Sequence, residues 1–171
     1  QSEAEAVDIP ADAWYYEEVQ DLYSSEIING YPDGTFRPKK TVTTGEALKM
    51  IMLAAGYGEQ APTVAGSTFS GYLAKAQADG LITRTNVNLS APITRLQVAQ
   101  LAAGAMKLDL NNLSSVTPFT DTADKHVQAL NAAGIMEGCL GGICAFIPLQ
   151  RGKHLLDEGC HSFCRGAAHI E

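Results

Sequence analysis

Apolar residues three positions apart recur in three short segments of the chain. In the first segment Val19 and Leu22 form such a pair, and the same pattern returns after 54 and after 108 residues. This spacing predicts one amphipathic helix in each segment, near residues 15–27, 69–80 and 124–133. The residues in register are Val19, Leu73 and Val127, then Leu22, Ala76 and Leu130, then Ile27, Leu81 and Ile135.

A second apolar stripe follows in each copy. Thr43 and Glu46 have the spacing of a capping box, in which each side chain accepts a backbone N–H of the other residue, so a helix is predicted to start near Thr44. Corresponding helices are predicted to start near Arg95 and Arg151. Each copy therefore consists of a helix, a loop and a second helix. The apolar positions are Leu48, Ile51, Met52 and Ala55, then Val98, Leu101, Ala102 and Ala105, then Leu156, Cys160, Phe163 and Ala167.

The three copies must share one core, because a single helix cannot bury its apolar stripe alone. We therefore expect a mostly α-helical fold built from repeats at residues 1–58, 66–110 and 117–171. The segments 59–66 and 109–117 are polar and rich in Pro, Gly, Ser and Asn. They are predicted to be linkers between the repeats.

The charge and hydropathy of the chain argue against two classes of partner. The 171 residues carry a formal net charge of −7, and no basic run is longer than Lys39-Lys40, so we expect no binding to nucleic acid. The longest apolar stretch, residues 96–108, is shorter than the ~18–20 residues that cross a bilayer, so no membrane insertion is expected. The first residue is Gln1, which fits removal of a signal peptide or an arbitrary end of a longer chain.

The first copy contains a long and specific motif. An Asp within residues 7–10 and a Trp-Tyr pair at residues 14–15 precede residues 27–38, which read Ile-Ile-Asn-Gly-Tyr-Pro-Asp-Gly-Thr-Phe-Arg-Pro. This order closely resembles the surface-layer homology (SLH) repeat of bacterial cell-envelope proteins. By the 54-residue register the resemblance covers nearly the whole chain as three copies. The second copy is degenerate, and the third has a cysteine-containing loop in place of the usual turn.

The resemblance implies both a fold and a function. SLH triplets are pseudo-threefold units, so we expect three pseudo-symmetric repeats around a central three-helix bundle. Grooves between neighbouring SLH repeats bind secondary cell-wall polymer, often through a terminal ketal-pyruvylated N-acetylmannosamine. The implied function is non-covalent anchoring of a secreted protein at the cell surface, in the cell wall or S-layer, with a cell-wall glycan as partner and no cofactor. A fused cargo domain could add self-assembly.

Such grooves draw on four kinds of residue in the family: the motif Arg, an Asp near the start of the repeat, a Trp and the turn Gly. Thr44 occupies the arginine position of the first repeat, so a groove built on that helix is expected to lack a cation for a carboxylate. No metal ligand is expected. The predicted ligand-binding residues carried over from the family are Arg95, Arg151, Asp8, Asp121, Trp14, Gly30 and Gly138.

The residue types alone leave alternatives open at these positions. An arginine at a helix start suits an acidic sugar, because its guanidinium binds a carboxylate through two parallel hydrogen bonds. Arg95 and Arg151 could instead form salt bridges across an interface between repeats. Trp14 could stack on a sugar ring or anchor the core at the entry of the first helix.

The four cysteines lie close together near the end of the sequence and allow two interpretations. Their spacing approaches that of zinc ligands, but disulfides are favoured in the secreted, oxidising context that the resemblance implies. Either bond would stabilise the third repeat locally. The disulfide candidates are Cys139, Cys144, Cys160 and Cys164.

No enzyme activity is expected, because the chain lacks the Gly-x-Ser-x-Gly, P-loop and His-Glu-x-x-His motifs. Two rival functions remain beside wall anchoring. The grooves could hold a protein partner in an assembly module of the cell envelope, or the chain could be a small glycan-processing enzyme.

Overall fold

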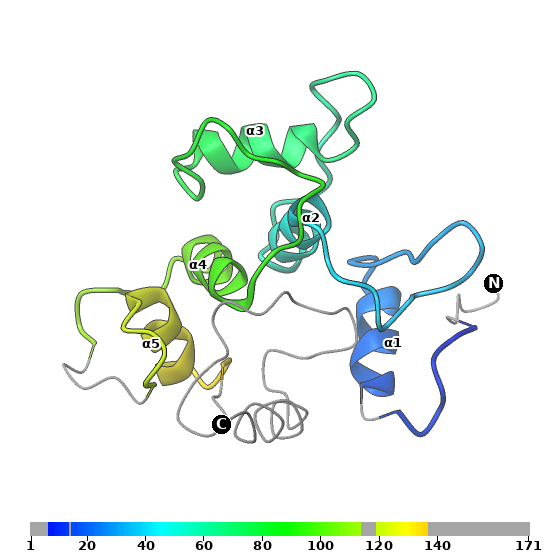
Figure 1. Cartoon of the computed structure of the whole chain (residues 1–171), viewed down its shortest axis with the longest axis horizontal. Helices are drawn as coiled ribbons and strands as arrows, with labels where there is room; N and C mark the ends of the chain where they lie inside the picture. Colours follow the sequence, from blue (N-terminus) through cyan, green and yellow to red (C-terminus); the bar gives the residue numbers. More distant parts are fainter. Residues whose placement is uncertain (1–6, 14, 114–118, 137–171) are drawn as a thin grey trace, which may run out of the picture.

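The computed structural model describes residues 7–13, 15–113 and 119–136. In these ranges the chain forms five α-helices and no β-strand, which confirms the prediction of a mostly α-helical fold (Figure 1). The predictions for Trp14, Gly138, Arg151 and the four cysteines lie outside the described residues, so the three-repeat arrangement stays a prediction. The helices are α1 (Tyr16–Ser24), α2 (Thr44–Ala54), α3 (Ser70–Ala78), α4 (Arg95–Ala105) and α5 (Lys125–Ala132).

The short helices α1, α3 and α5 end in the same way at positions 54 residues apart. Each is followed by one left-handed residue, with φ of 57° at Glu26, 74° at Gly80 and 71° at Gly134. After α1, the Ile27 N–H donates to the Leu22 carbonyl oxygen at 3.0 Å, and the same bond recurs after α3 and α5. This is the Schellman motif, which satisfies the last carbonyl groups of a helix. The register read from the apolar residues therefore also holds in the backbone.

The longer helices α2 and α4 begin with capping boxes. The Thr43 hydroxyl accepts the Glu46 N–H at 3.3 Å, and the Glu46 carboxylate accepts the Thr43 N–H at 2.9 Å. Thr94 and Gln97 make the corresponding pair of bonds before α4. The predicted starts near Thr44 and Arg95 are thus confirmed. These starts are 51 rather than 54 residues apart, because the first copy has the longer loop.

Helices α2 and α4 lie side by side near the centre of the view, with the short helices around them (Figure 1). The loops before the two helices are paired, since the Ile93 N–H donates to the Val42 carbonyl oxygen and the Thr44 N–H to that of Ala91. Helix α3 packs against α2, and α5 packs against α4. No described helix is long and apolar enough to cross a membrane.

The first copy has its own apolar cluster, which Met50 joins to α2. Ile9, Val19, Ile28 and Phe36 are all buried in this cluster, and the Met50 side chain of α2 packs against it. The turn after α1 is thereby fixed against one face of α2. That junction forms one wall of the pocket described below.

The predicted linker 59–66 is held firmly against α3. The buried Ser70 hydroxyl accepts the N–H groups of Thr63 and Val64 at 2.9 and 3.0 Å. Gly71 permits this approach, because a Cβ atom there would overlap the Ala61 carbonyl oxygen. The loop therefore has a defined position against α3. The polar composition of the segment did not predict this.

Candidate functional site

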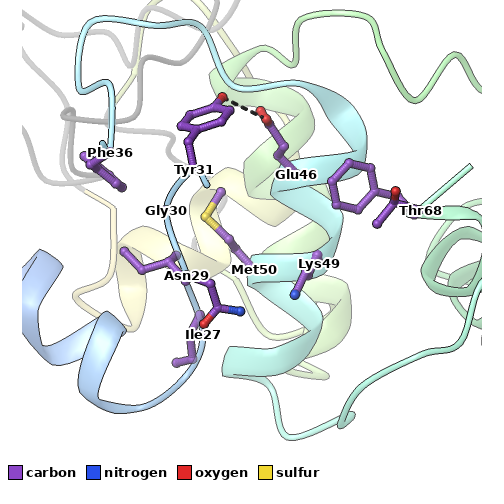
Figure 2. Close-up of a pocket in the computed structure, with 11 residues that line it drawn as sticks. Ile27, Asn29, Gly30, Tyr31, Phe36, Glu46, Lys49, Met50 and Thr68 are labelled. Carbon is purple, nitrogen blue, oxygen red and sulfur yellow. Dashed lines mark hydrogen bonds between the residues drawn. The ribbon is translucent and has the colours of Figure 1, made fainter. Parts of the chain in front are cut away.

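A pocket of about 270 Å³ opens between the first and second copies. One wall comes from the turn after α1, the floor comes from α2, and the opposite wall comes from the residues just before α3 (Figure 2). Small-molecule sites usually measure about 300–1,000 Å³, so this pocket suits a single ring-sized group. The lining residues are Ile27, Ile28, Asn29, Gly30, Tyr31, Phe36, Glu46, Lys49, Met50, Thr68 and Phe69.

The turn wall depends on Gly30. This residue has a φ of 66°, in the left-handed region that favours glycine. A Cβ atom there would overlap the Tyr23 hydroxyl oxygen and lie 3.0 Å from the Thr35 carbonyl oxygen. Glycine at this position therefore allows the chain to turn closely over α1 and into the pocket wall.

Asp8 clamps the same turn from behind. Its two carboxylate oxygens accept the N–H groups of Phe36 and Arg37 at 2.7 and 2.8 Å. The turn itself closes where the Gly34 N–H donates to the Tyr31 carbonyl oxygen, as the Tyr-Pro-Asp-Gly sequence predicts. Asp8 acts in this structure as a backbone clamp and does not line the pocket.

Tyr31 forms an aromatic edge of the pocket and is contacted by two cations. The Arg37 guanidinium carbon lies 3.9 Å and the Lys40 ammonium nitrogen 4.8 Å from the ring centre, which is cation–π geometry. The Tyr31 hydroxyl accepts from Lys40 at 2.9 Å and donates to the Glu46 carboxylate at 3.3 Å. The ring is thereby fixed at the junction of the turn and α2.

An exposed ion pair holds Arg37 over the ring. The Asp33 carboxylate accepts from the Arg37 guanidinium at 2.8 Å and from the Thr35 hydroxyl at 2.5 Å. These hydrogen bonds, first that of Thr35 and then that of Arg37, lower the pKa of Asp33 to about 2. The turn therefore carries its own charge network at neutral pH.

The second copy contributes an aromatic side chain to the opposite wall. Phe69 immediately precedes α3 and lies against Gly45 of α2, where a Cβ atom would overlap the phenyl ring. Beside it, the exposed Thr68 lines the mouth of the pocket. The close approach at Gly45 thus determines the distance between this wall and the floor.

Lys49 lies on the pocket floor in an ion pair with Glu59. The two charged groups are 3.4 Å apart, with 24% of the Lys49 side chain and 66% of the Glu59 side chain exposed. The Tyr72 hydroxyl donates to the Glu59 carboxylate and lowers the pKa of Glu59. Burial, together with that hydrogen bond, raises the pKa of Tyr72 to about 12. Glu59 is therefore a carboxylate fixed near the lysine.

A second hollow, of about 450 Å³, follows the turn after α3. Three of its positions correspond to pocket residues of the first copy by the 54-residue register: Ile82 to Ile28, Thr83 to Asn29, and Thr85 to Tyr31. The hollow has neither an aromatic nor a charged lining residue. It is lined by Gln77, Gly80, Ile82, Thr83 and Thr85.

Of the predicted ligand residues that the structure describes, Gly30 alone is among the residues that line the pocket between the first and second copies. Gly30 lines the pocket between the copies, whereas Asp8 lies behind the turn. Arg95 is the first residue of α4 and is only 6% exposed, and Asp121 is exposed in the loop before α5. Within the described ranges, no group of His, Cys, Asp and Glu could hold a metal ion.

The sequence reasoning missed the polar residues that do line the pocket. Asn29, Lys49 and Thr68 were not among the candidates, and the groove on α2 was expected to lack a cation. The motif position on α2 does hold Thr44, but a different cation, Lys49, lies five residues beyond it and lines the pocket floor. One signal was present: Lys49 is the single basic residue in a helix that is otherwise mostly apolar.

Comparison with known proteins identifies the segment that builds most of this pocket. Residues 7–48 match the model of the S-layer homology domain. These residues are therefore similar to an S-layer homology domain. This domain places the chain among secreted proteins of the bacterial cell surface, and it supports attachment to the cell wall in general. The match lies within the predicted first repeat, so the second and third repeats stay predictions.

The curated relatives of the chain include a surface-layer protein and a cell wall protein of bacteria. The chain is 34% identical over 105 residues to the Surface-layer 125 kDa protein of Lysinibacillus sphaericus. This alignment covers 54% of the chain and 9% of the relative. It is 30% identical over 103 residues to the Middle cell wall protein of Brevibacillus brevis. That alignment covers 60% of the chain and 9% of the relative. The chain thus spans less than a tenth of the length of these relatives.

Proposed function

We propose that the chain anchors a secreted protein to the bacterial cell wall without a covalent bond, by binding secondary cell-wall polymer. The pocket between the first and second copies is the proposed binding site. The observation that carries the proposal is the position of this pocket. Residues of the S-layer homology segment line it together with Lys49 and Met50, which directly follow that segment, and with residues 68–69 of the next copy.

The lining of the pocket suits a saccharide. A sugar ring has an apolar face and a rim of hydroxyl groups, and it binds best where aromatic and polar side chains alternate. Tyr31 and Phe69 provide aromatic rings, and Asn29 and Thr68 provide an amide and a hydroxyl group. Thr68 is exposed at the mouth, so the end of a polymer could enter while the remaining chain stays in solvent.

The preferred ligand is a glycan with a terminal ketal pyruvate, whose carboxylate gives the sugar a negative charge. A chain with a net charge of −7 can bind such an anion only through local cations. Arg95 and Arg151 remain proposed ligand residues for further grooves. Replacing either with Ala should weaken binding about ten- to a hundredfold, the loss expected for a charged hydrogen bond, whereas Thr44→Ala should change it little.

Sedimentation with purified cell walls tests the proposal. The chain should sediment with intact walls and remain in the supernatant with walls from which the secondary polymer has been chemically removed. Thr68→Trp should reduce sedimentation by filling the mouth of the pocket. Thr63→Trp is the matched control, because Thr63 is also an exposed threonine but does not line the pocket. Equal binding to stripped walls would overturn the proposal and favour a protein assembly module.

A further inference from the structure

The pocket between the copies contains a cation that the family motif does not supply. Thr44 is the first residue of α2, at the position that corresponds to Arg95 of α4. Lys49 lines the floor of the pocket from the same helix. Figure 2 shows the Lys49 ammonium and the Asn29 amide directed towards each other from the floor and the turn wall.

We propose that Lys49 is the residue that recognises the carboxylate of an acidic saccharide in this pocket. The inference rests on the proposed function and deepens it, because it names the group in this pocket that selects the acidic ligand. The first groove therefore binds an anion through a lysine on the second turn of α2, with no contribution from the motif arginine position.

The contacts of Lys49 leave it able to bind a ligand. An ammonium group has three N–H donors, and the separation of 3.4 Å from the Glu59 carboxylate is longer than the ~2.7–2.9 Å of a strong charged hydrogen bond. Glu59 is itself 66% exposed, and the Tyr72 hydroxyl holds it in place. A ligand carboxylate can therefore approach the ammonium group while Glu59 stays where it is.

The other carboxylate of the pocket is already engaged. Both oxygens of Glu46 accept hydrogen bonds, one from the Tyr31 hydroxyl and the other from the Thr43 N–H of the capping box. Its negative charge lies at the Tyr31 side of the pocket. We therefore place the ligand carboxylate at the opposite side, between Lys49 and Asn29, and the sugar ring against the aromatic edge.

The charge of Glu59 should affect the affinity for an acidic sugar if Lys49 binds the ligand. It should not affect that affinity if Lys49 has only a structural role. The Glu59 carboxylate stays beside the Lys49 ammonium group, where its negative charge repels a ligand carboxylate that binds the same ammonium group. Removing the charge of Glu59 should therefore tighten binding of an acidic sugar and leave binding of a neutral sugar unchanged.

Titration calorimetry with two small probes tests the inference. The first probe is the methyl glycoside of ketal-pyruvylated N-acetylmannosamine, and the second is its neutral methyl ester. Lys49→Gln should weaken binding of the acid about ten- to a hundredfold and leave binding of the ester unchanged. Lys49→Arg should restore most of the affinity for the acid, and Glu59→Gln should increase it.

Lys75→Gln is the matched control. Lys75 also pairs with a carboxylate, that of Asp79 at 2.9 Å, but it lies on α3 outside the pocket lining. This variant should bind both probes like the wild type. Thermal melting of each variant checks the fold, and little change is expected because Glu59 is 66% exposed and an ion pair with one exposed partner contributes little to stability.

The outcomes separate this inference from the proposed function. If the wild type and Lys49→Gln bind the acid equally and both sediment with intact walls, Lys49 is not the selecting group, although wall anchoring stands. If the wild type binds neither the acid nor intact walls, both proposals are wrong. If the wild type sediments with intact walls but does not bind the acid, the choice of an acidic saccharide is wrong.

Discussion

Gly30 offers the sharpest test of how the pocket wall is built. Gly30→Ala should destabilise the fold for two separate reasons. An alanine at a φ of 66° costs about 1–2 kcal/mol in left-handed strain. Its Cβ atom would also overlap the Tyr23 hydroxyl oxygen, and forcing an extra methyl group into a packed site costs about 1–3 kcal/mol. The expected total is about 2–5 kcal/mol.

Gly56→Ala separates the two contributions. Gly56 has a φ of 83°, also left-handed, but a Cβ atom there would meet nothing within 4 Å. Its cost should therefore be the strain alone, about 1–2 kcal/mol. The difference of about 1–3 kcal/mol between the two variants measures the steric conflict in the turn.

Urea unfolding followed by circular dichroism measures both costs. Adding Tyr23→Phe to Gly30→Ala should recover part of the lost free energy of unfolding, because it removes the oxygen that the new methyl group meets. Gly30→Ala should also reduce sedimentation with cell walls, since Gly30 lines the pocket. Equal destabilisation by Gly30→Ala and Gly56→Ala would refute the steric reasoning.

Three further predictions concern the turn and the end of the sequence. Asp8→Ala should destabilise the chain by about 1–3 kcal/mol in urea unfolding, because two backbone N–H groups lose their acceptor; an unchanged midpoint would contradict the clamp. The pKa of Asp33 is lowered from 3.8 to about 2, so its ion pair with Arg37 should be complete above about pH 4 and disappear as the pH falls through 2. A carboxyl NMR titration with a midpoint near 3.8 would count against this. Reduction or chelation should loosen the third copy and spare the first, with a local disulfide contributing roughly 2–3 kcal/mol; a mass showing four free thiols and no metal would disprove it.

Local signals in the sequence predicted the five helices of the described residues accurately. The capping box at Thr43 and Glu46 marks the start of α2, and the apolar stripe with Gly56 marks its end. Each of these signals acts within a few residues, because caps and Schellman motifs satisfy backbone groups of the same helix. The turn at Tyr31–Gly34 could be predicted for the same reason.

The pocket could not be predicted in this way, because it depends on segments that are distant in the sequence. Lys49 becomes a pocket residue only because Met50 joins α2 to the first copy and Gly45 admits Phe69 from the second. Neither contact has a local signature. The carried-over Asp8 illustrates the same limit, since the family motif identified the residue but its clamp on the backbone is visible only in three dimensions.

The central claim is that cell-wall polymer binds in the pocket between the first two copies. Chemical-shift mapping of the isotope-labelled chain with a soluble fragment of secondary cell-wall polymer tests it most directly. The account predicts that the largest saturable shifts cluster at Asn29, Lys49 and Thr68, and that the exposed loop residue Thr63 changes little. Saturable shifts that avoid this pocket, or no shifts at concentrations where intact walls bind the chain, would contradict it.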